Sequence, residues 1–201
     1  KEAARLIAGA KRPVILAGQG AMIARADKEL MALAETCGIP VTTTLLGIGA
    51  IPASSELNLG MMGMHGEAWV NQAIQQADLL IALGMRFDDR VTGNLKTYAL
   101  NAKKIHVDID PTEINKNVPV DVALIGDLRE VLAVIQPQIK KADHAEWWSA
   151  IAVNRGDSAV RDIKNLPDSG HLYAAHVIND IWRLTQKRDT IVVTDVGQHQ
   201  M

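Results

Sequence analysis

Four charged residues follow closely on an apolar run in the segment LLIALGMRFDDRVTG at 79–93: Arg86, Asp88, Asp89 and Arg90. Guanidinium groups donate fork-like hydrogen bonds to anionic oxygen, and carboxylates accept hydrogen bonds from hydroxyl and amino groups. Because open α/β sheets bind ligands at the carboxyl ends of their strands, this charged loop is a candidate ligand site. The alternative is a solvated turn whose charges pair with one another, since surface ion pairs are common and contribute little.

Two glycines follow a second apolar run, in the segment PVILAGQG at 13–20. Gly18 and Gly20 lack a Cβ, so the turn Gly18-Gln19-Gly20 can bring backbone N–H groups close to a ligand. The full dinucleotide-binding fingerprint needs a third glycine where Ile23 stands, which makes it a weak signal here. Taken alone, the segment is best explained as a tight turn.

Two further groups of residues are candidates for ligand contact. The segment 51–66 is predicted to be a long connection containing GMMGMHG, and long loops in compact domains are often functional. A methionine cluster is also typical of core packing. Asp108 and Asp110 end the run KIHVDID, where a carboxylate can accept hydrogen bonds from a ribose. The alternative is an N-cap for a short helix beginning at Pro111, and Asp110 fits that role better than Asp108 does.

Apolar patterns predict alternating helices and strands around these candidates. The five apolar residues of 79–83, bounded by Gly84, favour a strand buried on both faces. Other strands are predicted at 13–17, 40–46, 104–110 and 121–127, and helices at 2–11, 26–36, 67–78 and 128–140. Pro137 is expected to kink the last helix or to end it one turn early. This order predicts an α/β fold with a doubly wound, mostly parallel sheet of five or, as we expect, six strands and helices on both faces.

The pattern changes after residue 142. We expect a first domain at 1–142, a helical linker at 143–170 that contains Trp147 and Trp148, and the truncated start of another domain at 171–201. In this last part a helix is predicted at 172–184 and a strand from Thr190 onward. Both ends of the chain are expected to be cut, because it begins inside an amphipathic pattern and stops soon after a strand-like run.

Composition excludes several classes of function. Of 201 residues, 48% are hydrophobic and 22% charged, and the net charge of −2 gives no basic surface for nucleic acid or anionic membrane. No apolar run approaches the roughly 20 residues that cross a bilayer. Cys37, the single cysteine, allows no internal disulfide and is expected to pack in the core. The six histidines form no spaced ligand set, so no metal-binding residue is predicted.

Six segments of the chain, taken together, resemble one enzyme family: VILAGQG, PVTTTLLGIGA, LGMMGMHG, LGMRFDDRVTG, VDIDPTEINKN and DVGQHQM. In order and approximate spacing they are similar to the catalytic subunit of acetohydroxyacid synthase (acetolactate synthase), a thiamine-diphosphate enzyme that also carries FAD. The resemblance spans essentially the whole chain. RFDDRVTG and MGMHG distinguish it from pyruvate oxidase and other flavin-bearing relatives.

The resemblance implies a Rossmann-like central domain that holds FAD across the carboxyl ends of its strands. The residues matching the family's FAD-binding positions are Gly18, Gln19, Gly20, Thr44, Leu45, Met62, Gly63, Met64, His65, Gly84, Met85, Arg86, Asp88, Arg90, Val91, Asp108, Ile109 and Asp127. Met85 departs from the small residue usual there. The residues matching the start of the thiamine-diphosphate site are Val196, Gly197, Gln198 and His199. No catalytic residue is predicted, because neither the family's activating glutamate nor its Mg²⁺ ligands match any position here.

The implied activity is decarboxylation of pyruvate and condensation of the two-carbon unit with a second 2-oxo acid, pyruvate or 2-oxobutanoate, in branched-chain amino-acid synthesis. The complete enzyme is expected to use FAD, thiamine diphosphate and Mg²⁺. It is also expected to form a cytoplasmic homodimer or tetramer in a bacterium, with a small regulatory subunit. This chain alone is expected to be inactive. The alternatives are a flavin-using enzyme similar to pyruvate oxidase and a stand-alone nucleotide-binding module.

Overall fold

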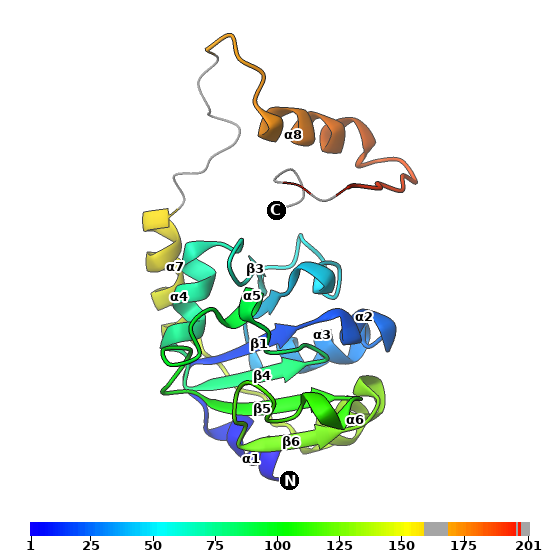
Figure 1. Cartoon of the computed structure of the whole chain (residues 1–201). Coiled ribbons are helices and arrows are strands. Elements are labelled where there is room, and N and C mark those ends of the chain that lie inside the picture. Colours follow the sequence, from blue (N-terminus) through cyan, green and yellow to red (C-terminus); the bar gives the residue numbers. More distant parts are fainter. Residues whose placement is uncertain (159–168, 196, 198–201) are drawn as a thin grey trace. The chain divides into compact units, whose positions relative to one another are not determined.

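The structure is a computed structural model that describes residues 1–158, 169–195 and 197. The chain forms two compact units, residues 1–154 and 155–201, and each is described here by itself (Figure 1). The first unit contains the sheet and all of the predicted FAD-binding positions. The second contains the helix α8 (Ala174–Thr185), close to the predicted helix at 172–184.

A six-stranded sheet forms the centre of the first unit, with strand order β3-β2-β1-β4-β5-β6 and every neighbouring pair parallel. Its strands are β1 (Pro13–Ala17), β2 (Val41–Thr43), β3 (Asn58–Met61), β4 (Leu79–Leu83), β5 (Lys103–Asp108) and β6 (Val122–Ile125). In the central pair, Pro13 lies opposite Leu79 and Ala17 opposite Leu83. The predicted α/β fold with a parallel sheet is confirmed.

The two central strands are apolar throughout because both of their faces are covered. In β1, Ile15 and Ala17 belong to one buried cluster, whereas Val14 and Leu16 belong to a second cluster on the opposite face. The residues of β4 alternate in the same way, and all five are buried. Alternation between two cores is what distinguishes such a strand from one with a solvent face.

Helices cover both faces of this sheet (Figure 1). Buried residues of α1 (Glu2–Gly9), α3 (Asp27–Cys37) and α6 (Leu128–Ile135) join the first cluster. Those of α4 (Ala68–Gln76) and α7 (Ala145–Ser158) join the second. A short 3₁₀ turn, η3 (Gln136–Gln138), follows α6 and contains Pro137, which confirms that the helix ends early. Cys37 is 1% exposed, as expected of a core residue.

The helix α7 extends the first unit beyond the predicted domain end at 142. Trp147 and Ile151 are each 2% exposed and lie in the second cluster. The indole Nε1 of Trp147 donates a 3.1 Å hydrogen bond to Pro13 O at the start of β1. The first half of the segment predicted as a linker is therefore part of the core of this unit.

Three local predictions were wrong. The connection at 51–66 contains β3, an edge strand of four residues with Gly60 at φ +98°, too short and irregular to give a strand pattern. The turn at Gly18-Gln19-Gly20 opens the short helix α2 (Gln19–Ile23). Residues 190–195, in the described part of the predicted strand, are not assigned as a strand and do not join the six-stranded sheet.

The order of the strands defines where the chain reverses its direction across the sheet. It moves outward from β1 through β2 to β3, then crosses to the other side of β1 and continues from β4 through β5 to β6. The turns after β1 and β4 therefore leave the sheet side by side at its carboxyl edge. In open α/β folds this is the position where ligands bind.

The helix α8 of the second unit carries apolar residues at helical spacing that remain in contact with solvent. Val177, Ile178, Ile181 and Trp182 are 37–55% exposed, and no residue of the helix is buried. No helix in the described part of the chain combines the length and apolar character needed to span a membrane.

Candidate functional site

The turns after β1 and β4 touch each other through their glycines. Gly20 N donates a 2.8 Å hydrogen bond to Gly84 O, and Gly18 N donates one of 3.0 Å to Leu83 O. A Cβ on Gly18 would lie 2.3 Å from Gly84 O, and one on Gly20 would lie 2.7 Å from Gly84 Cα. Contact between two backbones therefore accounts for these glycines. That they also admit a ligand stays a prediction.

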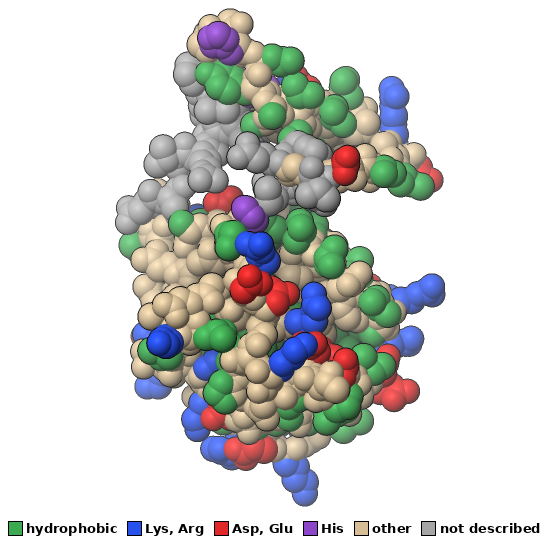
Figure 2. Space-filling view, viewed as in Figure 1, with side chains coloured by type: hydrophobic (Ala, Val, Ile, Leu, Met, Phe, Trp, Pro, Cys, Tyr) green, Lys and Arg blue, Asp and Glu red, His purple; other side chains and the backbone are tan. Residues whose placement is uncertain are grey.

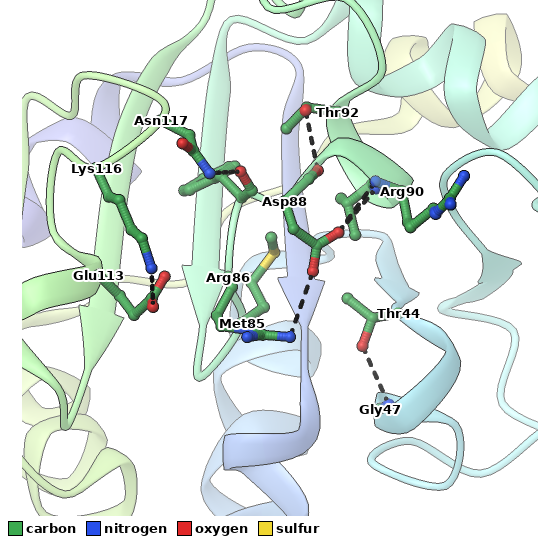
Figure 3. Close-up of polar contacts among 12 residues, drawn as sticks. Thr44, Gly47, Met85, Arg86, Asp88, Arg90, Thr92, Glu113, Lys116 and Asn117 are labelled. Atoms are coloured by element: carbon green, nitrogen blue, oxygen red, sulfur yellow. Dashed lines mark hydrogen bonds and ion pairs between the residues drawn. The ribbon is translucent and has the colours of Figure 1, made fainter.

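The loop after β4, of which Figure 3 shows Met85, Arg86 and Asp88, alternates between buried and exposed side chains. Met85 and Phe87 are 2% and 4% exposed and belong to the second cluster. Between and after them, the side chain of Arg86 is 65% exposed and that of Asp88 is 37% exposed. Because the backbone is extended, alternate side chains point to opposite sides. The buried Met85 and Phe87 anchor the loop, and the charged residues point outward.

Asp88 begins the short helix α5 (Asp89–Thr92). Its Oδ1 accepts hydrogen bonds from Arg90 N at 3.1 Å and Val91 N at 3.3 Å, and its Oδ2 lies 3.7 Å from the guanidinium of Arg86. Thr92 Oγ1 donates to Asp88 O at 2.9 Å. Asp88 is therefore an N-cap, so part of the charge cluster pairs internally, as the alternative explanation of the loop proposed.

Arg90 connects α5 to the methionine-rich loop that precedes α4. Met64 N donates to Arg90 O at 2.8 Å, and the Arg90 guanidinium lies 3.4 Å from Met64 Sδ. A Cβ on Gly63 would approach Arg90 O to 2.5 Å, so glycine is required there. The structure brings together two segments that the sequence places far apart, and the FAD positions predicted on each of them become neighbours.

The methionine cluster divides between core and surface. Met62 is 3% exposed and packs in the second cluster, whereas Met64 is 58% exposed. His65, also predicted to contact FAD, is exposed. Gly63 is held between them by Asn71, whose Oδ1 accepts from Gly63 N at 2.9 Å and whose Nδ2 donates to Gly63 O at 2.8 Å. Asn71 has no distinctive sequence motif and was not predicted.

The predicted positions after β2 form a tight turn against β1. Thr44 N donates to Ala17 O at 3.0 Å, and Thr44 Oγ1 accepts from Gly47 N at 3.2 Å to cap the 3₁₀ turn η1 (Leu45–Gly47). Leu45 is 39% exposed. Both residues therefore lie at the same edge as Gly18, with the leucine side chain directed into solvent.

The acids after β5 and β6 have different roles. Asp110 accepts hydrogen bonds from Thr112 and caps η2 (Pro111–Glu113), which lowers the pKa of its carboxyl and confirms the capping alternative for this residue. Asp108 is 12% exposed in its side chain, with Oδ1 accepting from Asp110 N at 2.9 Å. Asp127 caps α6 through one oxygen, which accepts from the backbone amides of Arg129 and Glu130. Ile109 is 70% exposed.

Two polar side chains that the sequence did not single out hold the loop after β4. His106, fully buried in β5, has Nε2 2.8 Å from Met85 O. Asn117 Nδ2 donates to Phe87 O at 2.9 Å (Figure 3). His106 lies within the strand sequence KKIHVD, and nothing in that sequence distinguishes it from the other buried residues of the strand.

Charges of both signs lie beside one another on the face of the first unit shown in Figure 2. In the described residues no three of the metal-binding side chains His, Cys, Asp and Glu come together as a possible ion site. The carboxyl edge therefore presents cations, single carboxylates and backbone groups, a set suited to an organic anion with hydroxyl groups.

A protein family described as "Thiamine pyrophosphate enzyme, central domain" matches residues 1–135. The chain belongs to this family. The matched range takes in all six strands and ends with α6 at Ile135. In this thiamine pyrophosphate enzyme central domain, the edge described above is formed wholly within the matched range.

Relatives of known description align with the whole chain. The probable acetolactate synthase large subunit of Methanocaldococcus jannaschii is 43% identical over 208 residues, and that of Methanococcus aeolicus 40% identical over 214 residues. The acetolactate synthase isozyme 3 large subunit of Escherichia coli is 39% identical over 208 residues. Each alignment covers 100% of this chain but only 35–36% of the relative. The chain thus spans about a third of their length.

Four predicted positions cannot be placed at this edge. Val196, Gln198 and His199 lie outside the described residues, and Gly197 belongs to the second unit. The prediction that these residues begin a thiamine-diphosphate site therefore remains a prediction.

Proposed function

We propose that the first unit of this chain binds FAD at the carboxyl edge of its sheet. The observation that carries the proposal is that the carboxyl edge where the strand order reverses presents two exposed cations, Arg86 and Arg90, after β4 and a largely buried carboxylate, Asp108, at the end of the neighbouring β5. A dinucleotide bound there needs donors for its diphosphate and acceptors for its ribose hydroxyls.

The residues at the edge fit such a ligand. The exposed guanidinium groups can turn toward diphosphate oxygens, because their contacts within the described residues are a long ion pair for Arg86 and a sulfur contact for Arg90. Asp127 uses one oxygen for capping, and its other oxygen has no hydrogen-bond donor among the described residues. In Asp108 the second oxygen lies 3.7 Å from His106 Nε2, beyond hydrogen-bond distance. Bound FAD would supply a flavin ring, for which the resemblance to acetohydroxyacid synthase implies a mainly structural role.

We propose further that the chain is the central part of an acetolactate synthase large subunit. Support comes from the names of its relatives and from alignments that extend over the entire chain. The whole protein would combine FAD with thiamine diphosphate and Mg²⁺, decarboxylate pyruvate, and join the two-carbon unit to pyruvate or 2-oxobutanoate. Val196, Gly197, Gln198 and His199 would begin the thiamine-diphosphate site in a domain starting near residue 171.

The relatives' description as large subunits also suggests a partner. A small regulatory subunit and assembly into a homodimer or tetramer are part of the proposal, as is a location in the bacterial cytoplasm. Pull-down with the small subunit encoded in the same genome tests the first of these. Light scattering of the full-length protein tests the second.

Titration of the purified chain with FAD, followed by flavin fluorescence, tests the binding proposal. We expect saturable binding with one FAD per chain and weaker competition by ADP. Binding of ADP or NAD⁺ in preference to FAD would favour a nucleotide-binding module instead. Full-length protein should form acetolactate from pyruvate, whereas hydrogen peroxide as the main product would favour an enzyme similar to pyruvate oxidase. No FAD binding by either protein would overturn the proposal.

A further inference from the structure

Two carbonyl groups of the loop after β4 accept hydrogen bonds from side chains outside the loop. His106 Nε2 lies 2.8 Å from Met85 O, and Asn117 Nδ2 lies 2.9 Å from Phe87 O. The donors come from β5 and from the segment between η2 and β6. They reach alternate residues of the loop, the same two residues whose side chains are buried in the second cluster.

The contact made by His106 fixes its tautomer. A carbonyl oxygen can only accept, so Nε2 must carry the proton that is donated to Met85 O. The other ring nitrogen, Nδ1, is buried and has no hydrogen-bond partner among the described residues. The ring of Phe87 lies edge-on to the imidazole, with centroids 5.1 Å apart. The imidazole is thus held between the loop's backbone and its aromatic anchor.

This arrangement is unfavourable for a residue that only fills space. A buried acceptor without a donor destabilises the folded state, and an apolar side chain of similar size would avoid that cost. Asn117 adds a second fixed donor although its own residue is exposed. His106 and Asn117 both hydrogen-bond to the backbone of the loop after β4. The conformation of that backbone sets the direction in which the charged side chains of the loop point.

We infer that His106 and Asn117 are positioning residues that set the orientation of Arg86 and Asp88. With the carbonyls of Met85 and Phe87 fixed, the extended backbone between them directs the intervening Arg86 outward and places Asp88 to cap α5. His106 also lies beside Asp108, 3.7 Å from its Oδ2, and so links the loop to the acid on the neighbouring strand. The consequence for ligand binding rests on the proposed FAD site, but the effect on the loop does not.

The test compares two substitutions at His106 in the full 201-residue chain. His106→Gln keeps a nitrogen donor at similar reach, whereas His106→Leu keeps the bulk and removes the donor. The matched control is His144→Leu. His144 is also buried, with Nδ1 2.8 Å from Cys37 O and Nε2 3.2 Å from Ala10 O, at the opposite edge of the sheet. Asn117→Asp supplies an independent arm, since it keeps the shape and loses the donor.

The primary readout is native-state hydrogen exchange of the α5 amides at Arg90–Gly93 relative to amides of α3, measured without ligand. We expect His106→Leu and Asn117→Asp to speed α5 exchange selectively by about tenfold, the effect of losing one hydrogen bond to a buried carbonyl. His106→Gln should restore most of the protection. His144→Leu should speed exchange in α3, whose last residue Cys37 it contacts, and leave α5 unchanged.

Equal loss of protection in α3 and α5 for His106→Leu, with no rescue by glutamine, would show a purely structural core residue and overturn the inference. FAD titration of the same variants is the second readout, with binding expected to weaken about tenfold for His106→Leu and little for His144→Leu. Loosened α5 with unchanged FAD affinity would overturn the positioning role. Failure of the wild-type chain and the full-length protein to bind FAD would refute the proposed site. Hydrogen exchange in α5 would still show whether His106 and Asn117 hold the loop.

Discussion

Gly20 N lies 2.8 Å from Gly84 O, so the turn that opens α2 is hydrogen-bonded to the turn that follows β4. The contact joins the two central strands at the point where the sheet reverses its order, and it leaves no room for a side chain on either turn. Glycine is therefore required at these positions in the first place because the two backbones approach each other closely.

Gly18→Ala should destabilise the first unit by about 2–3 kcal/mol, because its Cβ would lie 2.3 Å from Gly84 O and 2.4 Å from Met85 Cβ. The matched control is Gly9→Ala at the end of α1, where a Cβ meets nothing within 4 Å and a small gain in stability is expected. Urea unfolding followed by circular dichroism measures both. Equal stability of the two variants would contradict the close approach.

Asp108→Asn should weaken FAD binding by roughly tenfold or more, since a ribose hydroxyl loses a charged acceptor while the amide oxygen can still accept from Asp110 N. Asp110→Asn provides the comparison, because this exposed residue caps η2 and faces no proposed ligand group. Both affinities can be read from flavin fluorescence titrations. If the two variants bind FAD equally well, Asp108 does not contact FAD and only stabilises the turn through its hydrogen bond with Asp110 N.

Arg86→Ala and Arg90→Ala should lower FAD affinity far more than stability, because an exposed ion pair contributes about 0–1 kcal/mol. Arg5→Ala is a suitable control. Its side chain is 65% exposed, as is that of Arg86, and it pairs with Glu2 in α1. Melting temperature and FAD affinity should be measured on all three. Parallel losses in both quantities at Arg86 and Arg90 would indicate a structural charge cluster instead.

Burial raises the pKa of the Cys37 thiol above its ordinary value of 9.0. As pH rises the unfolded chain therefore loses this proton first, so the stability linked to the thiol is present below pH 9.0 and is lost above it. Between about pH 7 and pH 10 the unfolding free energy of the wild type should fall more steeply than that of Cys37→Ala. Parallel curves would mean that the thiol ionises equally in both states.

Much of the fold could be predicted because its strands carry a strong local pattern. The apolar run of β4 and its bounding Gly84 define a strand buried on both faces, and the acids that follow β5 mark a strand end. β3 could not be predicted, since its four residues at the sheet edge include a glycine with positive φ and depend on pairing with β2. The predicted strand beginning at Thr190 shows the converse, because its described residues 190–195 have an apolar, β-branched pattern and yet do not join the sheet.

The candidate site was predicted only in part, for a related reason. Sequence patterns mark residues that present charge, such as Arg86 and Asp108, because their type stands out beside an apolar run. They do not mark His106 or Asn117, whose importance arises from contacts with carbonyls distant in the chain, nor Asn71, which holds the backbone of Gly63. Those contacts exist only once the strands are aligned, so no local pattern contains them.

The alternation of buried and outward residues from Met85 to Asp88 separates two tasks that a single loop must perform. Side chains that hold the backbone lie on one side of it, and those offered to a ligand lie on the other. Selection can therefore alter the charge at position 86 without disturbing the anchorage of the segment, whereas Asp88 also caps α5. An ancestral domain with the same anchors could diversify its preferred cofactor by changing only the outward residues, and a protein engineer could follow the same route.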